Sequence, residues 1–79
     1  MAKVSNEQLK VMLDHDLAKM RCVNKNGHLI LEVCTSENWH ELHSKRGHVR
    51  EFKTFDAMVN HVGRLTDKPF NIDFVRGEN

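Results

Sequence analysis

Apolar and polar residues recur with two different periods along this chain, and these periods predict its elements. The first apolar stripe, from Leu9 to Leu13, has helical spacing. It follows a capping-box pair, Ser5 and Gln8, in which each side chain can bond the other residue's backbone N–H. The pattern therefore predicts a short helix over residues 6–14.

Strict alternation then predicts a β-hairpin. Met20 and Cys22 alternate with charged residues, and Asn26-Gly27, a pair that tolerates positive φ, separates them from the next apolar run. A two-residue loop places Cys22 opposite Leu31. A four-residue loop over residues 24–27 shifts the pairs but keeps the same faces. Because the two cysteines point to opposite faces in both cases, an intramolecular disulfide is not expected.

The second half of the chain predicts two more strands, a helix and a last strand. Residues 39–43 and 49–52 flank a turn at Lys45-Arg46-Gly47. Thr54 is a good N-cap for the helix that follows. The apolar stripe of that helix consists of Phe55, Met58, Val59, Val62 and Leu65. The last strand, over residues 70–74, alternates Phe70, Ile72 and Phe74 with polar residues.

These elements predict an α+β fold with the order α-β-β-β-β-α-β. The simplest arrangement is a small, mainly antiparallel sheet of four to five strands with both helices on one face. Residues 5–75 are expected to form a single domain. Residues 1–4 and 76–79 are expected to be flexible tails.

Composition narrows the function classes. The 79 residues include 12 Lys and Arg and 11 Asp and Glu, a net charge of +1, which weakens nucleic-acid binding driven by the field of the whole molecule. An apolar run of transmembrane length and a basic-then-apolar leader are both absent, so a cytoplasmic location without membrane contact is expected. A domain this small without a disulfide or metal is expected to self-associate.

The sheet face opposite the helices is the first candidate site. Ile30 and Cys34 point to it, and Trp39 on the neighbouring strand falls beside Cys34. An exposed aromatic patch on a small domain is typical of a contact surface. We therefore expect these three residues to bind a protein partner or a second copy.

The turn around residues 45–53 is the second candidate site. It carries Lys45, Arg46, His48, Arg50 and Lys53 against one acid, Glu51. Such a tip can contact phosphates or a negative protein surface, and it can also be charged merely because it is solvated. Phe52 is assigned to the core, so the basic hairpin (residues 45–53) lacks an aromatic platform for base stacking.

The other chemistry-bearing residues do not form a recognisable constellation. The six histidines and two cysteines lack the spacing of a zinc site, so neither a metal nor a cofactor is expected. Cys34 has no base fixed beside it, which disfavours a cysteine nucleophile. The glycines do not have the spacing of a phosphate-binding loop. We expect a protein that is not an enzyme.

The segment from Arg46 to Phe74 resembles small plasmid-encoded ParC-like partition-associated proteins, mainly over residues 46–75. The matching residues are Arg46, Gly47, Arg50, Phe52, Thr54, Phe55 and Asp56. The histidine content departs from the pattern, as does the linker at residues 66–69, where the family would have a glycine-containing turn. The resemblance implies an accessory protein of a mobile element and brings no catalytic residue.

The expected function is therefore that of a non-enzymatic accessory protein of a plasmid or other mobile element. It would act through protein–protein contacts, in DNA partition or maintenance. One alternative is a small inhibitor of a host nucleic-acid machine. Another is a direct DNA- or RNA-binding protein that uses the basic hairpin.

Overall fold

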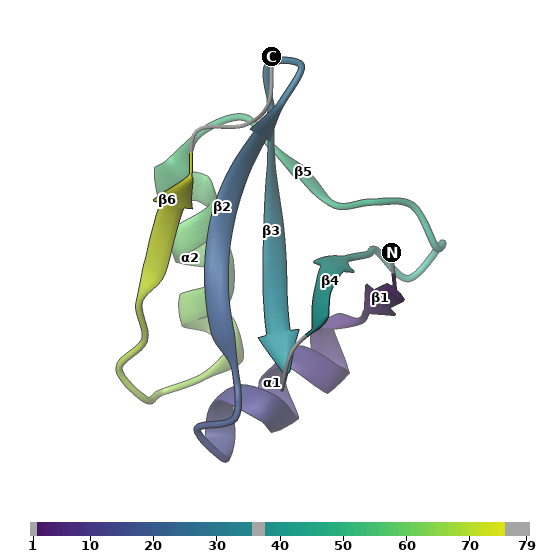
Figure 1. Ribbon diagram of the computed structural model, residues 1–79. Helices are drawn as coiled ribbons and strands as arrows, with labels where there is room; N and C mark the ends of the chain where they lie inside the picture. Colours follow the sequence, from purple (N-terminus) through teal and green to yellow (C-terminus); the bar gives the residue numbers. More distant parts are fainter. Residues whose placement is uncertain (1, 36–37, 76–79) are drawn as a thin grey trace.

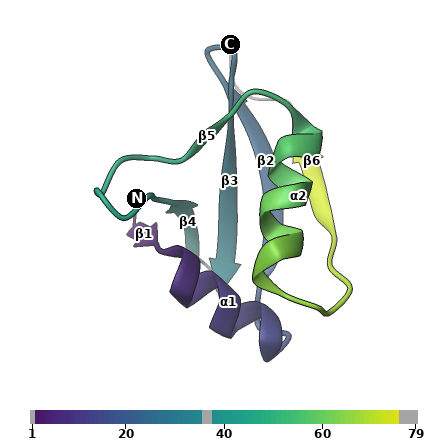
Figure 2. The same ribbon diagram turned by 180° about the vertical axis from the view of Figure 1, so that it is seen from behind.

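The computed structural model describes residues 2–35 and 38–75, which form an α+β fold with two helices and a mixed six-stranded sheet. Figures 1 and 2 show both helices on the same side of the sheet. In chain order the elements are β1 (Ala2–Val4), α1 (Asn6–Asp14), β2 (Lys19–Lys25), β3 (His28–Thr35), β4 (Asn38–Leu42), β5 (Glu51–Phe52), α2 (Phe55–Leu65) and β6 (Ile72–Val75).

The strand order across the sheet is β1-β4-β3-β2-β6, with β5 paired to β3 beyond the end of β4. Strand β3 pairs antiparallel with β2, β4 and β5. The two outer strands are parallel to their neighbours, β1 to β4 and β6 to β2. The sheet is therefore antiparallel at its centre and parallel at both edges.

The predicted faces of the central hairpin are confirmed, and of the two loops left open the structure has the two-residue turn, with Cys22 opposite Leu31. Asn26 and Gly27 have φ of 54° and 85°, the left-handed conformations that such a turn requires. The register sends one set of side chains toward the helices, where they meet the apolar stripes of α1 and α2. The buried core consists of Val4, Leu9, Leu13, Met20, Cys22, Leu31, Val33, Leu42, Phe52, Met58 and Val62.

Both helices begin and end as the sequence predicts. Ser5 and Gln8 form the capping box of α1, and the Thr54 hydroxyl accepts the backbone N–H of Ala57 at the start of α2. Neither helix in the described part of the chain is long and apolar enough to cross a membrane.

The expectation of a flexible tail over residues 1–4 is wrong for residues 2–4, which form β1. The carbonyl of Val4 accepts the N–H of His43 at 2.8 Å, and the Val4 side chain is buried. A three-residue strand with one core side chain gives almost no periodic signal, and its partner β4 lies far along the sequence. The observed order is therefore β-α-β-β-β-β-α-β.

The expectation of four to five mainly antiparallel strands also needs correction. Strand β6 is parallel to β2, because α2 carries the chain back to the end of the sheet from which β2 starts. The predicted strand 49–52 shortens to β5, and Val49 forms only an isolated bridge with His43. The tail expected at residues 76–79 lies outside the described residues.

His61 joins the two helices. Its Nε2 lies 2.9 Å from Oδ1 of Asn6 at the start of α1, and its ring lies 5.4 Å from that of Phe52. Burial, together with the positive charges of Arg50 and Arg64, holds the pKa of His61 below its usual range. The fold therefore favours the neutral imidazole, which can donate its Nε2 hydrogen to the Asn6 oxygen.

We predict that stability falls on acidification because of His61. Its pKa is lower in the folded than in the unfolded chain, so between these two values the unfolded chain binds more protons. His61 therefore lowers the free energy of unfolding as the pH drops below about 6.5, the ordinary histidine value. Urea unfolding at about pH 7.5 and about pH 5.5 measures this loss, which should be smaller in His61→Gln.

The matched control is His48→Gln, because His48 is exposed on the basic hairpin. This variant should keep the wild-type difference between the two pH values. An unchanged difference in His61→Gln would contradict the assignment.

Candidate functional site

The structure brings together two of the three residues predicted to form the first candidate site. Cys34 on β3 and Trp39 on β4 are directly opposite, and both are half-buried. The guanidinium of Arg21 covers the indole, with its central carbon 3.8 Å from the ring centroid. This cation–π contact occupies one face of the ring that was expected to be available to a partner.

Ile30 does not belong to this cluster, which corrects the expected surface. It is buried at 6% relative exposure and pairs with Val23, also buried. Along β3, Ile30 and Cys34 are four residues apart, about 13 Å in a strand. Glu32 lies between them on the same face. The apolar patch predicted on this face is therefore divided by a charged residue.

Glu32 is the centre of an ion-pair network on the sheet face opposite the helices. Its side chain is 2% exposed, and Oε1 accepts the Nε hydrogen of Arg21 at 2.6 Å. Nζ of Lys25 lies 3.4 Å from Oε2 of Glu32 and 3.0 Å from Oε2 of Glu41. The hydrogen bond to Glu41 raises the pKa of Lys25. Two cations and two carboxylates thus neutralise the middle of this face.

We infer that the same network helps to cover Ile30. Lys25 stands opposite His28, whereas Glu32 lies four residues further along β3. To reach Glu32 and Glu41, the aliphatic stem of Lys25 must cross the level of Ile30. Long cationic side chains commonly cover apolar surface in this way. Sequence analysis missed this role, although the predicted register already places Arg21 opposite Glu32.

The second candidate site is a closed hairpin, as the turn residues predict. The N–H of Arg50 bonds the carbonyl of Leu42, and the N–H of Ser44 bonds the carbonyl of His48, both at 2.8 Å. Gly47 has φ of 85° and closes the tip through an N–H bond to the carbonyl of Ser44. In Figures 1 and 2 the segment between β4 and β5 projects sideways from the body, on the side away from β6.

The structure exposes all of the predicted contact residues of the basic hairpin: Lys45, Arg46, His48, Arg50 and Lys53. None of them forms an ion pair with an acidic residue in the described part of the chain. Glu51 is the one acid within residues 45–53. Its Oε1 lies 3.8 Å from Nδ1 of His28, on the sheet face opposite the helices. The guanidinium carbon of Arg50 lies 5.4 Å from the centroid of the Phe52 ring. This contact does not neutralise its charge as a carboxylate would. The positive charge of the hairpin is therefore available to a ligand.

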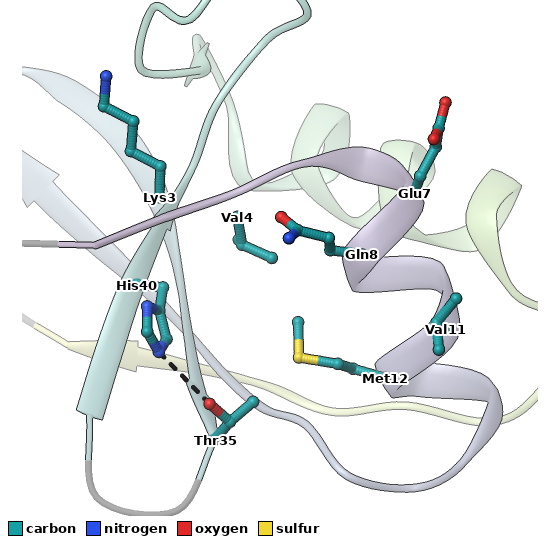
Figure 3. A pocket seen from close by; sticks show the side chains of 8 residues that line it. All are labelled: Lys3, Val4, Glu7, Gln8, Val11, Met12, Thr35 and His40. Carbon is teal, nitrogen blue, oxygen red and sulfur yellow. Dashed lines mark hydrogen bonds between the residues drawn. The ribbon is translucent and has the colours of Figure 1, made fainter.

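A hollow of about 510 Å³ lies between α1 and the β1/β4 side of the sheet (Figure 3). Figure 3 shows Val4, Gln8 and Met12 directed into it, whereas Lys3 and Glu7 point away. The one polar contact drawn among its lining residues joins Nε2 of His40 to Oγ1 of Thr35 at 3.3 Å. None of the predicted site residues lines this hollow, and no periodic pattern in the sequence indicates it.

The cysteines and histidines do not assemble into a metal centre within the described ranges. No three His, Cys, Asp or Glu side chains lie close enough there to hold an ion. Cys22 is fully buried in the core, and burial raises the pKa of its thiol, which keeps it protonated and unreactive. Cys34 lies on the opposite face of the sheet, half-buried.

Comparisons with protein-family models, with curated proteins and with solved structures found no match for this chain. Function is therefore inferred from the geometry of the two surfaces.

We predict that Glu32→Ala lowers the free energy of unfolding by roughly 2–3 kcal/mol. The substitution leaves two cations without their buried partner, which typically costs about 3–5 kcal/mol. Arg21 and Lys25 are 30% and 39% exposed and can turn partly to water, and Lys25 keeps its contact with Glu41, so the expected loss is smaller than this range. Urea unfolding monitored by Trp39 fluorescence measures the effect.

Glu51→Ala provides the control, because the Glu51 carboxylate is 53% exposed and its only ion-pair contact in the described residues is with the similarly exposed His28 at 3.8 Å. Its loss should change stability by less than about 0.5 kcal/mol. Equal losses in the two variants would show that the Glu32 network does not stabilise the sheet.

Proposed function

We propose that this protein is a non-enzymatic module that binds the phosphate backbone of nucleic acid through the basic hairpin. The observation that carries this proposal is the set of exposed, unneutralised cations on one closed hairpin. Lys45 and Arg46 lie at the tip, and Arg50 and Lys53 flank the returning strand β5. Such side chains bind phosphates by charge and by release of counterions.

The geometry favours the hairpin over the face around Trp39. Arg21 covers the indole, Ile30 is buried, and the neighbouring charges neutralise each other. No cation of the hairpin is paired with a carboxylate in the described part of the chain, although Arg50 also contacts the ring of Phe52. A net charge of only +1 does not oppose the proposal, because an exposed local cluster sets the potential near its own surface.

The resemblance to ParC-like partition-associated proteins supports the same kind of role. Two of its matching cations, Arg46 and Arg50, belong to the hairpin. On this proposal the protein is an accessory factor of a plasmid or another mobile element, and it contacts DNA during partition or maintenance. Contact with backbone phosphates alone would make its binding weakly dependent on sequence.

We predict that binding to a fluorescently labelled DNA duplex weakens steeply with salt. If Lys45, Arg46, Arg50 and Lys53 each meet one phosphate, a plot of log K against log salt has a slope of about −3.6. Arg46→Ala/Arg50→Ala should weaken binding and make the slope shallower by about 1.8. Fluorescence anisotropy across a salt series measures both quantities.

Lys19→Ala/Arg64→Ala is the matched control, because it removes two exposed cations that lie outside the hairpin. It makes the same change in net charge and should keep the wild-type slope. Equal weakening in both double variants would indicate non-specific attraction. If duplex and single-stranded nucleic acid both fail to bind, the proposal is wrong and an acidic protein surface becomes the better ligand for the hairpin.

A further inference from the structure

The outer edge of β6 is a second interaction surface, separate from the basic hairpin. Strand β6 ends the strand order and pairs with β2 alone among the described strands. Its other row of backbone N–H and C=O groups therefore faces outward. An edge of this kind is a template for another strand unless charges, proline or a bulge protect it.

The side chains of β6 do not protect this edge. Phe74 and Val75 are 58% and 38% exposed, and they are two of the four large hydrophobic residues that are exposed in the described part of the chain. Asp73 is the strand's single charge, and β6 contains neither lysine nor proline. By contrast, β1 at the opposite edge has only three residues and carries Lys3.

We propose that β6 pairs antiparallel with β6 of a second copy, so that the sheets of two molecules become continuous. Residues that stand directly opposite each other in an antiparallel pair point to the same face of the sheet, whereas neighbouring residues of one strand point to opposite faces. The two-fold axis that relates the two copies of β6 must therefore pass beside a residue that faces its own copy, not beside a peptide bond. An axis at Asp73 would place two carboxylates opposite each other, which is unfavourable. An axis at Phe74 instead pairs the two Phe74 rings and places Asp73 opposite Val75.

The Phe74-centred register also extends an aromatic contact that already exists. The ring of Phe74 lies 6.1 Å from that of Phe55 in an edge-to-face arrangement on the helix side of the sheet. Two copies would therefore bring four rings together across the axis, a favourable type of cross-strand contact. Because β6 is complementary to itself in this register, a second copy is the partner that it fits, in the isologous form typical of dimers.

Sedimentation velocity over the micromolar range tests the dimer. The wild type should be dimeric at the upper end, and Phe74→Lys should be monomeric at every concentration, since lysine blocks edge pairing. Val75→Lys should also give a monomer. The side chain at position 75 lies on the sheet face away from Phe55, so the contact between Phe74 and Phe55 stays intact in this variant. The matched control is Val11→Lys, because Val11 is also 58% exposed but lies on α1, and it should leave the dimer unchanged.

Oxidative cross-linking tests the register in a Cys34→Ser background. Phe74→Cys should give a linked dimer, because position 74 faces itself across the axis. Val75→Cys should link far less, because position 75 faces position 73.

A wild type that is monomeric throughout, a dimer that survives Phe74→Lys, or equal linking at both positions would overturn the proposal. Arg46→Ala/Arg50→Ala should remain dimeric, which separates this surface from nucleic-acid binding.

Discussion

The register of the β2–β3 hairpin is the constraint on which the rest of the structure depends. The turn at Asn26-Gly27 places Cys22 opposite Leu31, and this single choice sorts every side chain on the two central strands. One set enters the core beneath α1 and α2. The other set, which contains Arg21 and Glu32, faces away from the helices. A shift of one residue would exchange the sets and bury the charges under the helices.

Local signals were sufficient to predict the elements that carry their own pattern. The helix N-caps, the apolar stripes, the hairpin turn and the pairing of Cys34 with Trp39 all depend on residues close in sequence or on alternation. The two parallel edges were not predictable in this way. Strand β1 pairs with β4 and β6 pairs with β2 across long sequence separations, and neither strand encodes the direction of its partner. Their place is fixed by the paths of α1 and α2, which follow from tertiary packing.

The candidate site shows a different limit of sequence analysis. Alternation correctly assigns Ile30 and Trp39 to the face away from the helices, but it says nothing of the long side chains that cover them. Arg21 lies over the indole, and Lys25 reaches past Ile30 to the carboxylates. Long cationic side chains thus supply part of the cover on that face, where no helix lies. The basic hairpin was easier to predict, because its cations are close in sequence and have no acidic neighbour to meet.

The distribution of charge connects the two proposed surfaces. Acids and bases at the centre of the sheet neutralise each other around Glu32, so the excess positive charge is left at the basic hairpin, beside β4 and β1. Strand β6, at the opposite edge, is nearly free of charge. Pairing through β6 would therefore not bring the two hairpins together, and their mutual repulsion would be small. It would place them at opposite ends of one continuous sheet.

Two weak phosphate-binding sites held at a fixed separation bind a long polyanion much more tightly than either alone, provided that both can reach it. A domain with a net charge near zero could thus bind nucleic acid without the strong overall positive charge that such binding often uses.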